Sequence, residues 1–113
     1  MKEIKAIIQP SRLSKVIDAL KEIPHMPGVT VSEVKGFGRG LAETAADKET
    51  QWGVLCVGRI KLETVVTDEM ANHVVEIIQK NAHTGNIGDG KIFIYDVQDV
   101  VKIRTSERGS SAI

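Results

Sequence analysis

The amino-acid sequence predicts a single α+β domain, and three observations lead to this prediction. Segments of alternating polarity, typical of strands, are interleaved with two segments of helical periodicity. The elements occur in the order strand, helix, strand, long polar segment, strand, helix, strand, which is one βαβ unit repeated. Two such units interleave into the ferredoxin-like arrangement, a four-stranded antiparallel sheet with both helices on one face. The 113 residues suffice for one such domain, spanning residues 1–113.

The first βαβ unit is expected within residues 2–34. Residues 2–9 alternate between apolar and polar side chains and predict a strand that ends at Pro10. Ser11 is placed to cap a helix, which Pro24 prevents from continuing. The apolar residues of this helix recur every three or four positions: Leu13, Val16, Ile17, Leu20 and Ile23. Residues 29–34, rich in β-branched side chains, predict the second strand.

The second unit begins with residues 59–66, which alternate in polarity and predict a strand. Thr67 or Asp68 caps the helix that follows. Its expected buried residues are Met70, Ala71, Val74, Val75, Ile78 and Ala82. Residues 92–97 predict a fourth strand, and residues 101–104 a short fifth one within a C-terminal strand and tail of residues 100–113.

Between the two units lies a long polar segment, residues 38–58. A structureless stretch of this length is uncommon in a small domain unless it is functional, so we interpret it as a binding loop. Trp52, the only tryptophan, lies within it, where contact with a partner and collapse onto the domain are about equally natural. The predicted sheet also leaves one face without helices, which indicates self-association.

The balance of charge excludes several classes of function. The chain has 15 basic and 15 acidic residues, so it lacks the positive electrostatic field that would attract nucleic acids or anionic membranes. A start with interleaved charges is unlike a signal peptide, and no apolar stretch is long enough to insert into a membrane. Cys56 is the only cysteine, which excludes an internal disulfide. We therefore expect a cytoplasmic protein.

The segment Thr84 to Lys91 carries three glycines and ends in a lysine, a composition that suits a phosphate-binding loop. It is not a P-loop, because it follows a helix and opens a strand, and Ile92 replaces the Ser or Thr that would bind Mg²⁺. A glycine-rich turn with Gly85 capping the helix is the alternative. Five cations fall at strand ends or in the glycine-rich segments, where a polyphosphate could gather them: Arg39, Arg59, Lys91, Lys102 and Arg104. The histidines and Cys56 show no metal-ligand spacing, so no metal site is expected.

Several of these motifs resemble those of the PII signal-transduction family, the nitrogen regulatory proteins PII. The family's C-terminal signature is matched by Thr84 together with Gly-Asp-Gly-Lys-Ile-Phe at residues 88–93. Its Val-Lys-Gly-Phe-Gly-Arg segment occurs at residues 34–39, and its terminal Arg-Ile-Arg-Thr as Lys-Ile-Arg-Thr at residues 102–105. The resemblance implies a homotrimer that binds ATP or ADP between subunits, with Mg²⁺ accompanying ATP, and that extends a T-loop, here residues 38–58, toward target proteins.

The resemblance also implies roles for individual residues. Those implied to hold the phosphates are Gly88, Asp89, Gly90 and Lys91, with Lys102 and Arg104 reaching across the subunit boundary. Those lining the base pocket are Thr30, Glu63 and Val65, and those approaching from the base of the T-loop are Gly36, Gly38, Arg39 and Arg59. Lys48 and Trp52 are expected to contact the partner protein.

The T-loop departs from the family pattern at two points. Gly40 replaces the glutamine that completes a Mg²⁺ shell in members sensing 2-oxoglutarate, so binding of that ligand should be lost or weakened. The family's modifiable tyrosine is absent, since the corresponding stretch, residues 47–52, contains none. This excludes uridylylation there.

The leading hypothesis is a nucleotide-binding signalling protein, not an enzyme, that regulates a transporter or an enzyme through its T-loop. An enzyme catalysing slow ATP hydrolysis or phosphoryl transfer in the same cleft is the alternative, although no general base is evident. A purely structural trimeric adaptor is a third possibility, which predicts no nucleotide binding.

Overall fold

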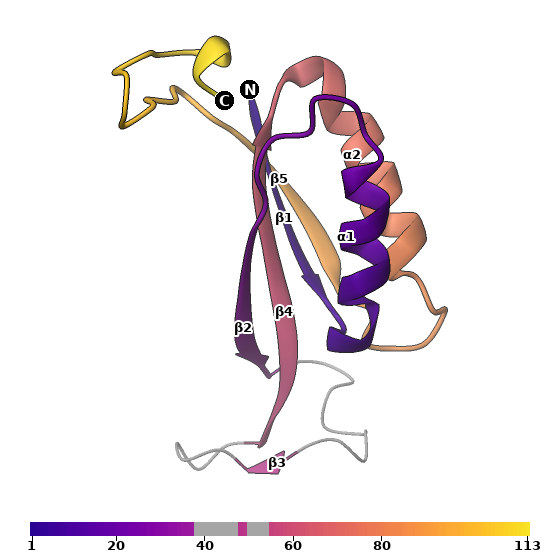
Figure 1. Ribbon diagram of the computed structural model, residues 1–113. Coiled ribbons are helices and arrows are strands. Elements are labelled where there is room, and N and C mark those ends of the chain that lie inside the picture. The colour runs from indigo at the N-terminus through magenta and orange to yellow at the C-terminus, as the bar shows by residue number, and fades with distance from the viewer. Residues whose placement is uncertain (38–47, 50–54) are drawn as a thin grey trace.

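The computed structural model describes residues 1–37, 48–49 and 55–113. Strands β2, β4, β1 and β5 form, in this order, one antiparallel sheet, and both helices lie on the same face of it (Figure 1). The elements are β1 (Lys2–Ile8), α1 (Leu13–Lys21), β2 (Thr30–Gly36), β3 (Lys48–Glu49), β4 (Leu55–Val66), α2 (Asp68–Ala82) and β5 (Lys91–Asp96), with 3₁₀ helices at Pro10–Arg12 and Ser110–Ala112. The predicted fold class is confirmed.

The core lies between the helices and one face of the sheet. In β1 every second residue is buried, and the register of β1 with β4 places Ala6 opposite Leu62 and Ile8 opposite Ile60. The helices contribute the buried side chains Val16, Leu20, Ala71, Val74, Ile78 and Ala82. Each large aliphatic side chain in this layer stabilises the fold by about 1.5–3 kcal/mol relative to exposure. The apolar faces predicted for residues 2–9, residues 59–66 and both helices are confirmed, although Met70 and Val75 of α2 are only partly buried.

The second face of the sheet carries charges as well as apolar side chains. Lys5 lies opposite Glu63 on one side and Phe93 on the other. Its ammonium nitrogen lies 5.5 Å from the ring centroid of Phe93 and 4.9 Å from that of Tyr95. Both rings are about 40% exposed, at 41% and 42%. Exposed aromatic rings on a sheet face are typical of a surface that a partner covers, although this face is more polar than the topology alone suggested.

The predicted binding loop of residues 38–58 is too long at its C-terminal end. Strand β4 begins at Leu55 and includes the buried residues Cys56 and Val57. The two-residue strand β3 pairs with this extension, Lys48 opposite Cys56. The prediction was based on the high polar content of residues 38–58 as a whole, which outweighed the short apolar run at the start of β4. The other residues of the predicted loop lie outside the described part of the chain.

The predicted fifth strand at residues 101–104 is wrong. Val101 forms a single bridge with Arg108, and a turn follows Lys102. The turn is closed by hydrogen bonds from the Lys102 amide to the Glu107 carbonyl and from the Ser106 amide to the Lys102 carbonyl, 2.9 and 2.8 Å long. Pairing within the segment replaces pairing with the sheet, because the turn directs the chain back along itself.

Two predicted helix caps also differ from the structure. Ser11 does not cap α1, because Pro10 starts a 3₁₀ helix and α1 begins only at Leu13, with no side-chain cap. Thr67 is the N-cap residue of α2, as predicted, but without a side-chain hydrogen bond. Helix α2 ends at Ala82 with His83 as its C-cap, so Gly85 lies beyond the cap and serves the loop instead.

Candidate functional site

The loop between α2 and β5, residues 84–91, is termed the glycine loop. Its three glycines all have positive φ, +89° at Gly85, +99° at Gly88 and +95° at Gly90. Residues with a side chain rarely adopt this conformation. The freedom of glycine to take positive φ is therefore used at all three positions.

Gly90 is required for a second reason, its contact with β1. A Cβ atom at this position would overlap the carbonyl oxygen of Ile7 and lie 2.8 Å from its carbonyl carbon. Because backbone atoms cannot move aside as a flexible side chain can, only glycine lets the loop approach β1 this closely. This contact fixes the loop to the lower end of the sheet in Figure 1.

Arg59 of β4 meets the glycine loop at Gly88. One guanidinium nitrogen, Nη2, lies 3.0 Å from the position of a Cβ on Gly88, and the other, Nη1, donates a 2.9 Å hydrogen bond to the carbonyl of Gly58. Gly36 pairs with Val57 at the same end of the sheet. Arg59, Gly88, Gly90 and Lys91 are termed the loop cluster. These residues, predicted from separate stretches of sequence, are brought together.

The Asp89 side chain turns inward and organises the loop. Its carboxylate accepts hydrogen bonds from the Thr84 hydroxyl, from the Thr84 amide at 2.8 Å and from the Gly85 amide at 2.9 Å. The bond from the Thr84 hydroxyl, followed by that from the Thr84 amide, lowers the pKa of Asp89 below its usual value.

Two residues beside Asp89 were missed by sequence reasoning. The Gln9 side-chain amide donates to Oδ1 of Asp89 at 3.2 Å, and His83 Nδ1 lies 3.8 Å from Oδ2. Gln9 is 80 positions from Asp89, so spacing alone could not identify it. His83 is adjacent to the predicted loop and could have been included on that ground.

The predicted base-pocket residues also lie together. Thr30, Glu63 and Val65 line one shallow cavity of about 250 Å³, together with Glu3, Gly28 and Thr64. The Thr64 hydroxyl donates a 3.0 Å hydrogen bond to the Gly28 carbonyl, which joins the start of β2 to β4. Thr30, Glu63 and Val65 are termed the base cluster.

Lys102 and Arg104 lie on a projecting segment, residues 97–109, termed the C-terminal loop. Asp99 organises this loop by accepting hydrogen bonds from the Val100 and Gly109 amides, at 2.8 and 3.2 Å, and from Arg108 at 2.8 Å. The bond from Arg108, followed by that from the Val100 amide, lowers the pKa of Asp99. Lys102 Nζ lies 3.7 Å from Glu107, whereas Arg104 is exposed in the turn.

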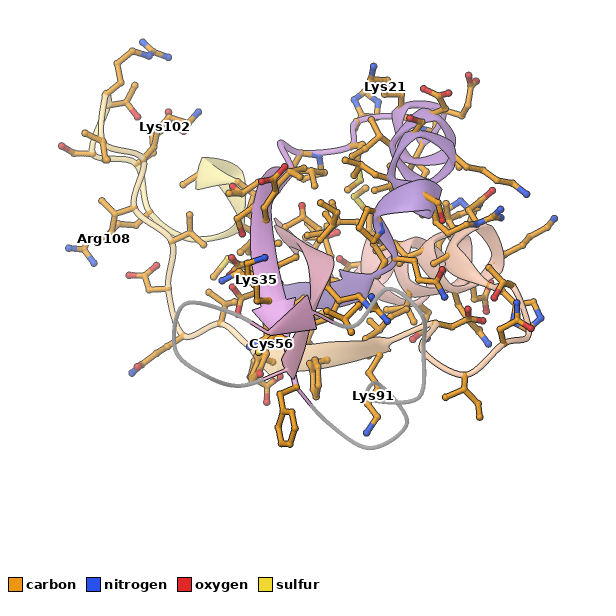
Figure 2. All side chains as sticks on the ribbon, turned by 90° about the horizontal axis from the view of Figure 1, so that it is seen from below. Lys21, Lys35, Cys56, Lys91, Lys102 and Arg108 are labelled. Carbon is orange, nitrogen blue, oxygen red and sulfur yellow. The ribbon has the colours of Figure 1, made fainter. Side chains whose placement is uncertain are left out.

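The loop cluster and the base cluster lie at opposite ends of the sheet. Arg59 and Val65 are six residues apart on β4, which corresponds to roughly 20 Å along an extended strand. The C-terminal loop extends from the end of the sheet that carries the base cluster, away from the glycine loop (Figure 1). Figure 2 accordingly shows Lys102 and Lys91 far apart. Within one protomer the predicted phosphate ligands therefore form two separate groups.

The structure gives little or no position for the remaining residues predicted from the sequence. Gly38, Arg39 and Trp52 lie outside the described residues, as does Gly40, and Lys48 is placed only as part of β3. Among the described residues, His, Cys, Asp and Glu side chains form no group of three or more that could hold a metal ion. The helices of this part of the chain are all too short or too polar to cross a membrane.

The sheet topology and the paired helices define a ferredoxin-like α+β domain. A family model described as "Nitrogen regulatory protein P-II" matches residues 1–107. The chain belongs to this family, whose members are named as regulatory proteins, and the resemblance seen in the sequence is confirmed.

Individual relatives agree over the full length of the chain. Proteins named "Nitrogen regulatory protein P-II" from Azospirillum brasilense and "Nitrogen regulatory protein P-II 1" from Escherichia coli are 45% and 44% identical over 113 residues, covering 100% of each chain. The crystal structure of Arabidopsis thaliana PII bound to citrate matches with a TM-score of 0.80 and 38% identity, covering 99% of this chain and 91% of that one.

Proposed function

We propose that the protein is a homotrimeric regulator that binds ATP or ADP between neighbouring protomers and acts on a target transporter or enzyme through its T-loop. The observation that carries this proposal is the separation of the two clusters. A nucleotide whose base occupies the base cluster of one protomer cannot reach the glycine loop of the same protomer. It can reach the glycine loop of a second protomer packed against the first, as family membership leads us to expect.

The chemistry of each cluster supports a divided site. The loop cluster offers backbone amides on positive-φ glycines with the charges of Arg59 and Lys91, a combination that suits phosphate groups. The base cluster supplies a small cavity in which Thr30 and Glu63 lie opposite each other on adjacent strands. Lys102 and Arg104, on the C-terminal loop beside the base cluster, add cations that meet the phosphates at the subunit boundary. A relative crystallised with citrate, a small polyanion, is consistent with anion binding in this fold.

The position of β4 supports communication between the nucleotide and the T-loop. One end of β4 carries β3, and Arg59 lies three residues beyond Cys56, the partner of Lys48 in β3. A phosphate contacting Arg59 and Gly88 therefore touches the strand that leads directly into the T-loop. Nucleotide binding at this end of β4 would therefore shift the populations of T-loop conformations, one of which the target recognises.

Regulation is favoured over catalysis by the state of Asp89. This carboxylate belongs to the glycine loop, but it already accepts four hydrogen bonds, from Thr84 (two), Gly85 and Gln9. A general base needs a free oxygen within reach of the proton that it abstracts. Its lowered pKa also makes it a weaker base. Phosphoryl transfer remains the competing function, and a phosphate-release assay distinguishes it.

Calorimetric titration with ATP and ADP, combined with light scattering, tests the proposal. We expect a trimer that binds both nucleotides, in the presence or absence of Mg²⁺, with one site per protomer and no measurable phosphate release. A trimer that binds neither nucleotide would support a purely structural adaptor. A protein that is monomeric at micromolar concentration, or that turns ATP over, would contradict the proposal.

A further inference from the structure

Asp89 lies in the proposed phosphate-binding loop, and its carboxylate is hydrogen-bonded to donors of the protein itself. Oδ1 accepts from the Thr84 hydroxyl and from Gln9, and Oδ2 accepts from the amides of Thr84 and Gly85. The side chain is only 23% exposed. Both oxygens are thus occupied by protein donors.

These bonds connect three parts of the chain. Thr84 and Gly85 follow the end of α2, Asp89 lies one residue before the close contact of Gly90 with Ile7, and Gln9 follows β1. The Thr84 hydroxyl also accepts from the amide of Asn86 at 3.1 Å. The carboxylate therefore closes residues 84–89 into a ring in which Gly88 adopts its positive φ next to Arg59.

A negative charge in a phosphate-binding loop repels the phosphates, so its presence there calls for a structural reason. Arg59 at Gly88 and Lys91 are cations close to this charge, and His83 Nδ1 lies 3.8 Å from the carboxylate. The donors of Thr84 and Gly85 stabilise the ionised carboxylate, and neither Arg59 nor Lys91 forms an ion pair with it in the described part of the chain.

We propose that Asp89 is a positioning residue of the nucleotide site: its carboxylate shapes the glycine loop through Thr84 and Gly85 and does not itself bind phosphate or Mg²⁺. This inference rests on the proposed nucleotide site and assigns Thr84 and Gln9 to the same supporting group. The phosphates are held by the amides of residues 88–90, Lys91 and Arg59.

The test compares Asp89→Asn, Thr84→Val and Thr84→Ser by calorimetric titration with ATP and ADP, each with and without Mg²⁺. Asparagine retains the shape of the side chain but replaces one acceptor oxygen by an NH₂ donor, so either the Thr84 hydroxyl and Gln9 or the amides of Thr84 and Gly85 lose their acceptor. Valine retains the shape of threonine without its hydroxyl, whereas serine keeps the hydroxyl. Asp18→Asn, an exposed position on α1, is the matched control.

We expect Asp89→Asn and Thr84→Val each to weaken ATP and ADP binding by about tenfold, equally with and without Mg²⁺. The double variant should be little weaker than either single one, because both remove the same support. Thr84→Ser and Asp18→Asn should bind as the unmodified protein does. Rescue by serine distinguishes positioning from a general loss of stability.

Three results would overturn the inference. Tighter binding by Asp89→Asn would show a carboxylate facing the phosphates, and loss of the Mg²⁺ effect alone would show a metal ligand. Unchanged binding would show that the loop needs no such support. Failure of the unmodified protein to bind ATP or ADP would instead contradict the proposed function. In that event, unaltered NMR shifts of the Thr84 and Gly85 amides in Asp89→Asn would independently reject the hydrogen-bonded ring.

Discussion

The glycine loop and the C-terminal loop are each organised by an aspartate, but only the glycine loop packs against the body of its own protomer. In each, one aspartate accepts hydrogen bonds from two backbone amides, Asp89 in the first and Asp99 in the second. The glycine loop then packs against β1 through Gly90, whereas the C-terminal loop projects from the domain and leaves Ile103 99% exposed.

This difference shows which part of the site a protomer completes alone. The glycine loop is held by contacts with its own protomer, between Gly90 and Ile7 and between Asp89 and Gln9. The C-terminal loop has a defined shape but no described surface of its own protomer beneath its tip. A fully exposed isoleucine between two cations is best explained by burial against a second copy. In the proposed trimer, the glycine loop supplies the half of the nucleotide site that one protomer completes, and the C-terminal loop supplies the half that depends on a second protomer.

The largest effect is expected from Gly90→Ala. The added Cβ meets the backbone of Ile7 and also requires a strained positive φ, so we expect a loss of about 2–4 kcal/mol in the free energy of unfolding and loss of nucleotide binding. Gly109→Ala in the C-terminal loop is the matched control, since its φ is +81° but nothing lies within 4 Å of the new Cβ. Denaturant titration should show a smaller loss of about 1–3 kcal/mol there, from backbone strain alone, because φ +81° with ψ −161° is a conformation that residues other than glycine rarely adopt. Equal losses would show that the packing contact is unimportant.

Ile103→Ser should affect assembly without affecting the protomer. The Ile103 side chain is not buried within its own protomer, so the substitution should leave the secondary structure unchanged. It should weaken the association of protomers by about 1.5–3 kcal/mol per interface. Light scattering over a dilution series measures this, with Ile103→Leu as the conservative control. A trimer of unaltered stability would mean that the C-terminal loop is not buried at the interface.

Lys91→Ala should weaken ATP and ADP binding by about 1–3 kcal/mol, because it removes a charge-assisted contact to phosphate. Lys21→Ala, at the end of α1 and far from both loops (Figure 2), is the control for loss of one positive charge. Calorimetric titration provides the comparison. An unchanged affinity would remove Lys91 from the site.

The smallest effect concerns pH and compares the two aspartates directly. Both pKa values are lowered in the folded protein, so the hydrogen bonds contribute fully above the unfolded pKa of about 4 and are lost as the pH falls through the folded values. NMR shifts of the Thr84, Gly85, Val100 and Gly109 amides should be constant at neutral pH and change only below about pH 4. A transition of the Thr84 and Gly85 amides at neutral pH would instead contradict the assignment of these shifts to Asp89.

The sequence was sufficient for the elements whose apolar pattern is regular. The alternation in β1 and the stripe of α2 both predicted the buried residues, because burial on one face imposes the period of the element. The pattern failed at residues 101–104, where a turn within the segment outweighed β-branched composition. It also failed at Leu55, since the start of β4 was averaged with a polar neighbourhood.

The candidate site divides in the same way. Residue types in the motif identified the glycine loop and Arg59, but not the direction of the Asp89 carboxylate, which depends on hydrogen bonds that form only in the fold. Gln9 could not be found from spacing, because the sheet brings it to Asp89 from the opposite end of the sequence. The separation of Lys102 from Lys91 is likewise a property of the topology and has no sequence signal.

The central claim is that each nucleotide site joins the glycine loop of one protomer to the C-terminal loop of another, and mixed trimers test it directly. Lys91→Ala disables the first half, and the double variant Lys102→Ala/Arg104→Ala disables the second. Trimers of either variant alone should bind ATP weakly at every site. Random 1:1 mixed trimers should recover unmodified affinity at about a quarter of their sites, where two intact halves meet. A mixture with no recovered sites, or full affinity in the C-terminal double variant, would contradict the account.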